Sequence, residues 1–396
     1  MTLLDLPSRG DEAWRWSDLS ALPEIAARPA QGGAPEALPW IDCALSGPRL
    51  LFVDGALVRE QSDLGPVEIG AVAAEAPDHP LGRLAGRRGW RLRLAANHAP
   101  LGLVQIVHVS TGGADHLAAE IALDEDAQAS IVETYVGEGW ANRLTGIILY
   151  RGARLMLARR VLASAGFASF TDRATVGEGA SLTMTNLAAG GADTRIDGHI
   201  RLAGEGAYAE AGGALLARGS GRHDANVVVR HDMPGGTSRQ LWRSVADDRA
   251  ICSVAARVEV ARGAQKTDGE QSLKGLLLSR SATINAKPEL EIFADDVKCA
   301  HGATVGELDR DALFYMASRG IPPADAKALL TRAFLGDAIA RVGEEAVRDA
   351  FGADVEAWFT PLKPLPFRGG VGVGDVNDHS ASPTGPTPGP SPEGEG

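Results

Sequence analysis

The middle of the chain repeats a short turn of small residues at almost constant intervals. Each turn is followed by a run in which apolar and polar residues alternate. The turns are Asp126-Ala127, Gly152-Ala153, Gly179-Ala180, Gly206-Ala207, Gly235-Gly236 and Gly263-Ala264. The sequence numbers of successive turns differ by 26, 27, 27, 29 and 28. A nearly fixed period of this length is typical of proteins built from stacked structural repeats.

The runs between the turns have the period of two that marks a strand with one buried face. Val254, Ala256 and Val258 share one parity, and Arg257 and Glu259 share the other. No helical period of useful length occurs between residues 120 and 295, and the consensus of leucine-rich repeats is absent. We therefore predict a mainly β fold, a β-solenoid whose inward residues form one narrow core. An antiparallel sandwich of long hairpins is the alternative that the repeat leaves open.

Composition agrees with a solenoid and excludes some functions. Glycine accounts for 48 of 396 residues, about 12%, against an average of about 7%. Glycine suits coil corners because it tolerates positive φ. The net charge of −12 argues against a nucleic-acid-binding protein, since that function needs a basic surface to neutralise phosphates.

The repeats are flanked by regions of different character. Helical structure is expected around residues 14–27, followed by a hairpin whose turn is Asp54-Gly55. After Gly302 the pattern becomes helical, with runs at 310–319, 326–334 and 339–351. We expect this helical block to cap the open end of the solenoid and to cover its strand edge.

These patterns predict four regions. They are an N-terminal helical and mixed region (1–100), a parallel β-helix core (101–303), a C-terminal helical domain (304–366) and a disordered tail rich in Pro and Gly (367–396).

The sequence also bears on cellular location and redox state. The N-terminus has no apolar signal-peptide core, and no apolar stretch approaches the length of a membrane span. We expect a cytoplasmic chain without a membrane span. The three cysteines, Cys43, Cys252 and Cys299, are an odd number at wide spacing and do not form a disulfide framework.

The sharpest candidate site is Cys299-Ala300-His301, at the junction between the last strand and the helices. Residues i and i+2 of a strand share a face, and thiolate and imidazole both suit iron or zinc. Closed zinc sites and most clusters need four ligands, but the chain has no second Cys-x-His and no Cys-x-x-Cys. Either the missing ligands come from another chain or from substrate, or both residues are structural. Which face they occupy depends on the register, which Asp295-Asp296 can shift by one residue.

Other combinations point to different chemistry. Glu289 and Glu291 share a strand face and fit the paired carboxylates of a β-helix polysaccharide lyase or hydrolase, but a charged outer face of the solenoid explains them more simply. His223 and His231 are assigned to the core or to solvent. A structural solenoid stabilised by zinc at Cys299 and His301 is a further alternative. Neither a nucleotide-binding P-loop nor the G-x-S-x-G of serine hydrolases occurs.

Several segments resemble the SufD family of the SUF iron–sulfur cluster assembly scaffold. The most specific is KCAHGATVGELDRDALFYMASRGIPPADAKALLTRAFLGD at 298–337. More diffuse matches are EAWRWSDL near the N-terminus, LFVDG at 51–55, VHVSTG at 107–112, ASIVETYVG at 129–137 and DMPGGTSRQ at 232–240. The paralogous SufB proteins read Cys-x-His-Glu where this chain has Cys-Ala-His-Gly, which favours SufD.

The resemblance implies a right-handed parallel β-helix between helical N- and C-terminal regions. It implies a heterodimer with SufB through the β-helix edge, and docking of the ATPase SufC on the C-terminal helices. It places Cys299 and His301 as a partial metal site at the SufB interface, binding a transient cluster of iron and sulfide or persulfide that is shared with SufB.

The expected function is therefore a non-catalytic scaffold subunit that builds and transfers nascent clusters. We expect ATPase activity in SufC, no resident cofactor in the isolated chain, and pairing of the isolated chain with a second copy through the same edge.

Overall fold

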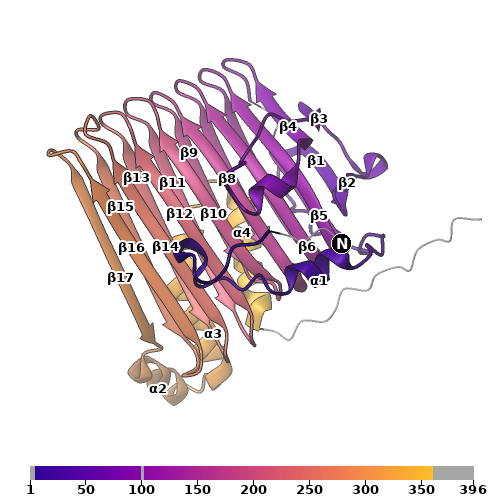
Figure 1. Cartoon of the computed structure of the whole chain (residues 1–396). Coiled ribbons are helices and arrows are strands. Elements are labelled where there is room, and N and C mark those ends of the chain that lie inside the picture. The colour runs from indigo at the N-terminus through magenta and orange to yellow at the C-terminus, as the bar shows by residue number, and fades with distance from the viewer. Residues whose placement is uncertain (1–4, 100–101, 360–396) are drawn as a thin grey trace, which may run out of the picture.

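A computed structural model describes residues 5–99 and 102–359. The chain forms a parallel β-solenoid with two faces, flanked by helices near both ends of the sequence (Figure 1). Among the described residues, no helix combines the length and apolar character needed to cross a membrane. The predicted tail at 367–396 lies outside the described residues.

Each coil contributes one strand to each of two faces. The first face, called face A, contains β7 (Arg154–Val161), β9 (Ser181–Ala188), β11 (Tyr208–Ala217), β13 (Thr237–Ala246), β15 (Asp268–Leu277) and β17 (Lys298–Glu307). The second, face B, contains β8 (Ala165–Val176), β10 (Asp193–Leu202), β12 (Arg222–His231), β14 (Ile251–Val260) and β16 (Thr283–Ile292). Every one of these pairings is parallel, which rules out the antiparallel sandwich.

The first coils are built from longer strands. β5 (Leu103–Leu123) and β6 (Gln128–Leu149) each run through a corner and belong to both faces. The first half of β5 pairs with β1 (Ser46–Val53), and its second half pairs with β4 (Arg88–Leu94). Two antiparallel hairpins complete this end, β1 with β2 (Ala56–Leu57) and β3 (Val67–Ala71) with β4. The predicted turn at Asp54-Gly55 is confirmed, since both residues have positive φ (49° and 77°).

The predicted corners stack on one another through backbone hydrogen bonds. The N–H of Gly152 donates to Glu178 at 2.9 Å, and the N–H of Gly179 donates to Glu205 at 2.9 Å. The sixth predicted corner is misplaced, because Lys266 (φ 62°) and not Gly263 holds the stacked position and donates to the carbonyl of Asp296. An additional turn, closed by the N–H of Ala264 on Ala261, lengthens that coil.

The C-terminal helices do not cap the open end, so that expectation is wrong. They are α2 (Arg310–Ser318), α3 (Pro323–Ile339) and α4 (Glu345–Phe359), and α3 and α4 lie against the outer surface of face A (Figure 1). Phe351, Val355 and Trp358 pack there against outward apolar residues of β9, β11 and β13. The third predicted helix starts at Glu345, not near 339. The strand edge of β16 and β17 is left uncovered by these helices.

The N-terminal region is less helical than expected. In residues 5–99 the helical elements are the short η1 (Glu12–Trp14), α1 (Leu22–Ala27), η2 (Arg59–Gln61) and η3 (Gly82–Ala85). Trp14 and Leu22 bury against Trp140 and Phe167 on the outer surface of face B. This segment therefore runs across the coils and joins them from outside.

The solenoid core is apolar along most of its length but contains a buried ionic cluster. Arg159 donates to both carboxylate oxygens of Asp172 at 3.0 Å and to Glu133 at 3.2 Å, and all three side chains are almost fully buried. Burial acts to raise the pKa of Glu133, but the hydrogen bond with His108 and the charge of Arg159 lower it to about 2. Removing Arg159 would leave Glu133 and Asp172 buried without its counter-charge, at a cost of about 3–5 kcal/mol.

Candidate functional site

Cys299 and His301 lie on β17, the last strand of face A. β17 pairs in register with β15, which places Cys299 opposite Gly269 and His301 opposite Gln271. Gly269 and Gln271 belong to the buried, inward parity of β15. Cys299 and His301 therefore share the inward parity, and Asp295-Asp296 introduces no change of register that would turn them outward.

Nothing in the described chain stacks on the far side of β17, so both side chains lie on an open face, but they differ in exposure. Cys299 is half-buried, and its Sγ lies beside the space that a Cβ at Gly269 would occupy. It packs against the apolar cluster that contains Val258 and Val260. Burial raises the pKa of the Cys299 thiol, so the neutral thiol is favoured at neutral pH. His301 is exposed at the open end.

A row of polar side chains continues from His301 into the core. Gln240 on β13, Gln271 on β15 and His301 on β17 occupy matching positions of successive coils. Both glutamines are 1% exposed. Gln240 Nε2 donates to the carbonyl of Arg257 at 2.9 Å, but Gln240 Oε1 and both polar atoms of Gln271 have no hydrogen-bond partner within the described chain. Unpaired polar atoms at this depth are rare in folded proteins.

Sequence reasoning missed both glutamines. The alternation in β13, where Gln240 precedes Leu241 and Trp242, contains the signal, since Gln240 shares the parity of the buried Trp242. Recognising that Gln271 lies next to His301 also requires the length of the intervening coil, and the predicted corners end at Gly263, before that coil begins.

The described residues contain no group of three or more His, Cys, Asp or Glu side chains arranged to hold a metal ion. Cys299 and His301 therefore bring two donors to the open end. Asp296 pairs with Lys266 at the neighbouring corner. The zinc-stabilised alternative gains no further ligand from the described chain.

The open end is an unprotected strand edge. In the described structure β16 pairs with β14 and β17 pairs with β15, and neither strand has a partner on its other side. Apolar side chains are exposed along this end: Phe293 is 60% exposed and Val305 44%. An uncovered edge with exposed apolar residues is a template for pairing with another chain.

A second surface lies where α2 leaves the solenoid. An apolar groove of about 530 Å³ runs between α2, the start of α3 and the end of β15. Leu278, Leu308 and Leu313 line it. Phe314 and Tyr315 of α2 are 78% and 59% exposed, and α2 buries none of its residues. We define this surface as the α2 groove.

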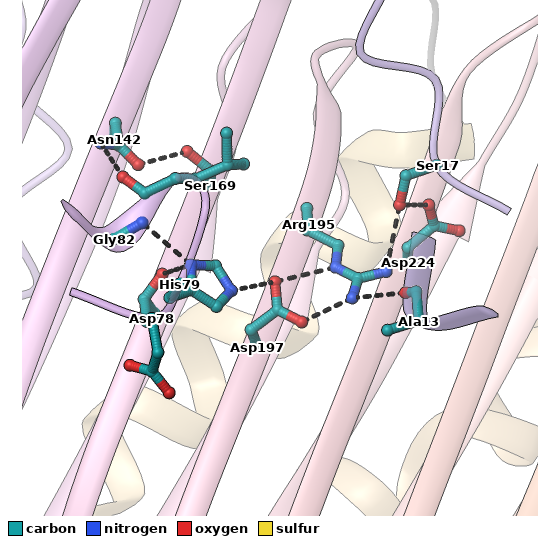
Figure 2. A network of polar contacts seen from close by, with 12 residues as sticks. Ala13, Ser17, Asp78, His79, Gly82, Asn142, Ser169, Arg195, Asp197 and Asp224 are labelled. Atoms are coloured by element: carbon teal, nitrogen blue, oxygen red, sulfur yellow. Dashed lines mark hydrogen bonds and ion pairs between the residues drawn. The ribbon is translucent and has the colours of Figure 1, made fainter. Parts of the chain in front are cut away.

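A polar network that the sequence did not reveal joins the N-terminal segment to face B (Figure 2). Arg195 donates to Asp197, to the Oγ of Ser17 at 3.0 Å and to the carbonyl of Ala13 at 2.9 Å. Asp197 also contacts His79 Nε2 at 3.3 Å. Burial acts to raise the pKa of Asp197, but the charge of Arg195 and the hydrogen bond with His79 lower it to about 2. The network fixes the segment over β10 and β12.

His223 and His231 belong to the core, one of the two assignments made from the sequence. They are 1% and 0% exposed, and burial lowers the pKa of each to about 4. His223 Nε2 contacts the carbonyl of Leu216 at 3.0 Å, and His231 Nε2 contacts Ser238 Oγ at 2.8 Å.

Glu289 and Glu291 lie on the outward parity of β16, opposite the outward residues of β14. Glu289 forms ion pairs with Lys287 at 3.1 Å and with Arg257 at 3.5 Å. Lys287 also pairs with Glu12 at 2.6 Å. These ion pairs account for Glu289 without a catalytic role.

Comparison with known proteins places the geometry in context. Residues 107–334 match the family model described as the SufBD core domain of SUF system FeS cluster assembly. The "Iron-sulfur cluster assembly protein SufD" of Escherichia coli K12 is 27% identical over 368 residues, covering 87% of each chain. "Protein ABCI7, chloroplastic" of Arabidopsis thaliana is 31% identical over 239 residues, covering 58% of this chain and 50% of that one. The SufD protein of Bacillus subtilis is 30% identical over 156 residues, or 39% of this chain and 36% of that one.

Proposed function

This chain belongs to the SufBD family of iron–sulfur cluster assembly proteins, and from that premise we propose that it is a non-catalytic scaffold subunit. In this proposal it pairs with SufB through the edge of β16 and β17. It receives SufC on its C-terminal helices. A nascent cluster then forms between the two solenoids, with His301 as a ligand from this side.

The observation that carries the proposal is the position of the Cys299 and His301 pair. Inward residues of middle coils are buried between neighbouring coils, whereas His301 has the inward parity and is exposed. A chain stacked on β17 would cover His301 and bring its own side chains against it. Two donors on the last coil are therefore suited to a site that a second chain completes.

The two donors suit different parts of the chemistry. A neutral imidazole binds iron without losing a proton. The Cys299 thiol must lose its proton to act as a ligand or to carry persulfide sulfur. Because burial raises the pKa of this thiol, it is a weak nucleophile in the free chain. Iron brought close by the partner would favour the thiolate, so Cys299 becomes active only in the assembled complex.

The α2 groove supports the proposed SufC contact. Its exposed Phe314 and Tyr315 offer an apolar docking surface, and α3 and α4 connect that surface to face A. Nucleotide hydrolysis belongs to SufC in this proposal. Movement of the helices on ATP binding would reorient the two solenoids and expose the interface between them. The cytoplasmic location expected from the sequence stays a prediction.

The test is anaerobic isolation of the complex after coexpression with SufB and SufC. We expect His301→Ala to leave the three subunits together but to lower the visible absorbance of the bound cluster and the maturation of iron–sulfur enzymes in cells. His98→Ala is the matched control, because His98 is also exposed and lies outside the site. Unchanged cluster yield with His301→Ala would contradict the ligand role, and loss of SufB from the wild-type preparation would contradict the pairing.

A further inference from the structure

One hydrogen bond, made by Gln240, limits how the polar row beneath His301 can be completed. Gln240 uses its amide nitrogen on the carbonyl of Arg257, so its Oε1 remains free to accept. Side chains in register on neighbouring strands are about 4.8 Å apart, and stacked glutamines form amide ladders in which each nitrogen donates to the next oxygen. Gln271 Nε2 is the donor in register with Gln240 Oε1.

Gln240 Oε1 and Gln271 Nε2 are both unpaired in the described chain, and a rotation of the Gln271 amide would join them. Completing the row in this way leaves Gln271 Oε1 for His301, which is its partner in the register. Gln271 is 1% exposed and neither of its polar atoms has a partner in the described chain. A buried carbonyl oxygen without a donor destabilises the fold, and the ring N–H of the adjacent imidazole is a donor that can satisfy it.

We propose that Gln271 is a positioning residue, whose side-chain oxygen accepts the ring N–H of His301 and fixes a single imidazole tautomer. The opposite ring nitrogen then presents its lone pair away from the solenoid, toward whatever is stacked on β17. Metal-binding histidines commonly hold their second ring nitrogen in this way, because a hydrogen bond there fixes the ring orientation. The inference rests on the proposed function, and it adds the residue that prepares His301 before the partner and the iron arrive.

The experiment uses the free, full-length chain, labelled with nitrogen-15 at histidine and held at pH 8. Nitrogen chemical shifts distinguish the two neutral tautomers, and the signals of His301 are those lost in His301→Ala. We expect one tautomer in the wild type and a mixture in Gln271→Met, which has a similar size but no acceptor. Gln271→Glu should restore the single tautomer, because a carboxylate is also an acceptor.

Glu270→Gln is the matched control, since Glu270 is the exposed neighbour on the outward parity of β15. It should leave the His301 signals unchanged. If Gln271 were only a packing residue, Gln271→Met would keep the single tautomer, and that result would overturn the inference. A mixture of tautomers in the wild type would overturn it as well. The wild-type spectrum keeps the inference falsifiable should Gln271→Met fail to fold, because it does not depend on that variant.

These outcomes are separate from those of the complex. The tautomer is measured without SufB, SufC or iron, so a negative result removes the role of Gln271 and leaves the ligand role of His301 intact. Conversely, unchanged cluster yield with His301→Ala would remove the ligand role, whereas the tautomer measurement would still report whether Gln271 contacts the ring.

Discussion

A buried ion pair holds the C-terminal helices on the solenoid, and the free-energy cost of breaking it follows from the structure. Arg160 on β7 donates to both carboxylate oxygens of Asp354 on α4, at 2.7 and 2.9 Å. The side chains are only 8% and 12% exposed. Because this pair joins face A to the proposed SufC-binding helices, we predict that Arg160→Met lowers the stability of the fold and loosens the attachment of α4 to face A.

The magnitude follows from what the substitution leaves behind. In Arg160→Met the Asp354 carboxylate keeps its burial and loses its counter-charge, and breaking a buried pair on one side costs about 3–5 kcal/mol. Burial already raises the pKa of Asp354 against the effect of Arg160, so removing Arg160 raises it further. The variant should therefore be less destabilised at pH 5 than at pH 7, since a protonated Asp354 no longer carries a buried charge.

Urea unfolding followed by tryptophan fluorescence measures both effects, because Trp358 is on the same helix. The double variant Arg160→Met with Asp354→Leu removes both charges, and it should recover most of the lost stability. A loss below about 1 kcal/mol in the single variant would mean that the pair behaves as an exposed one. A double variant as unstable as the single one would refute the charge argument, and only packing would remain as the cause.

Three further predictions address a core histidine, two glycines of the solenoid and the N-terminal segment. The pKa of His223 is about 4 in the folded chain and about 6.5 in the unfolded chain. Because only the unfolded chain binds this proton between these values, the free energy of unfolding is unaffected by His223 above pH 6.5 and falls by about 3 kcal/mol as the pH drops to 4. His223→Gln should remove that part of the pH dependence of the unfolding free energy, whereas the exposed His98→Gln should leave it. Gly213→Ala places a Cβ 1.8 Å from a backbone carbonyl oxygen of the preceding coil, so it should prevent folding or lower the free energy of unfolding by more than about 3 kcal/mol. Gly206→Ala, with open space around it, should lower the free energy of unfolding by about 1–2 kcal/mol. Arg195→Met should increase proteolysis of the N-terminal segment that contains η1 and α1, and equal cleavage in both proteins would contradict the anchoring role.

The period of two and the recurring turns predicted the solenoid because both depend only on local sequence. The position of the C-terminal helices depends on which strand faces are apolar outside as well as inside. β11 is buried along nearly its whole length, from Ala209 to Ala217, and a strand buried on both faces loses its alternation. The run from Ala211 to Ala217, which contains only small and apolar residues, is the sign in the sequence that a helix covers face A. The helices were instead assigned to the open end because an uncovered edge is usually protected.

The site was predictable only in part, for a reason that lies in the architecture. Cys299 and His301 are close together in sequence, so their shared face follows from the strand period alone. Gln271 lies a whole coil earlier in the chain, and it meets His301 only because the intervening coil has the length that brings the strands into register. In a solenoid, inward side chains of middle coils are enclosed by the coils on either side, and only the last coil presents such a side chain to another molecule. In the two proposals above, His301 is positioned from below by its own chain and its metal site is completed from above by the next chain, which is why two donors on the last coil are informative about function.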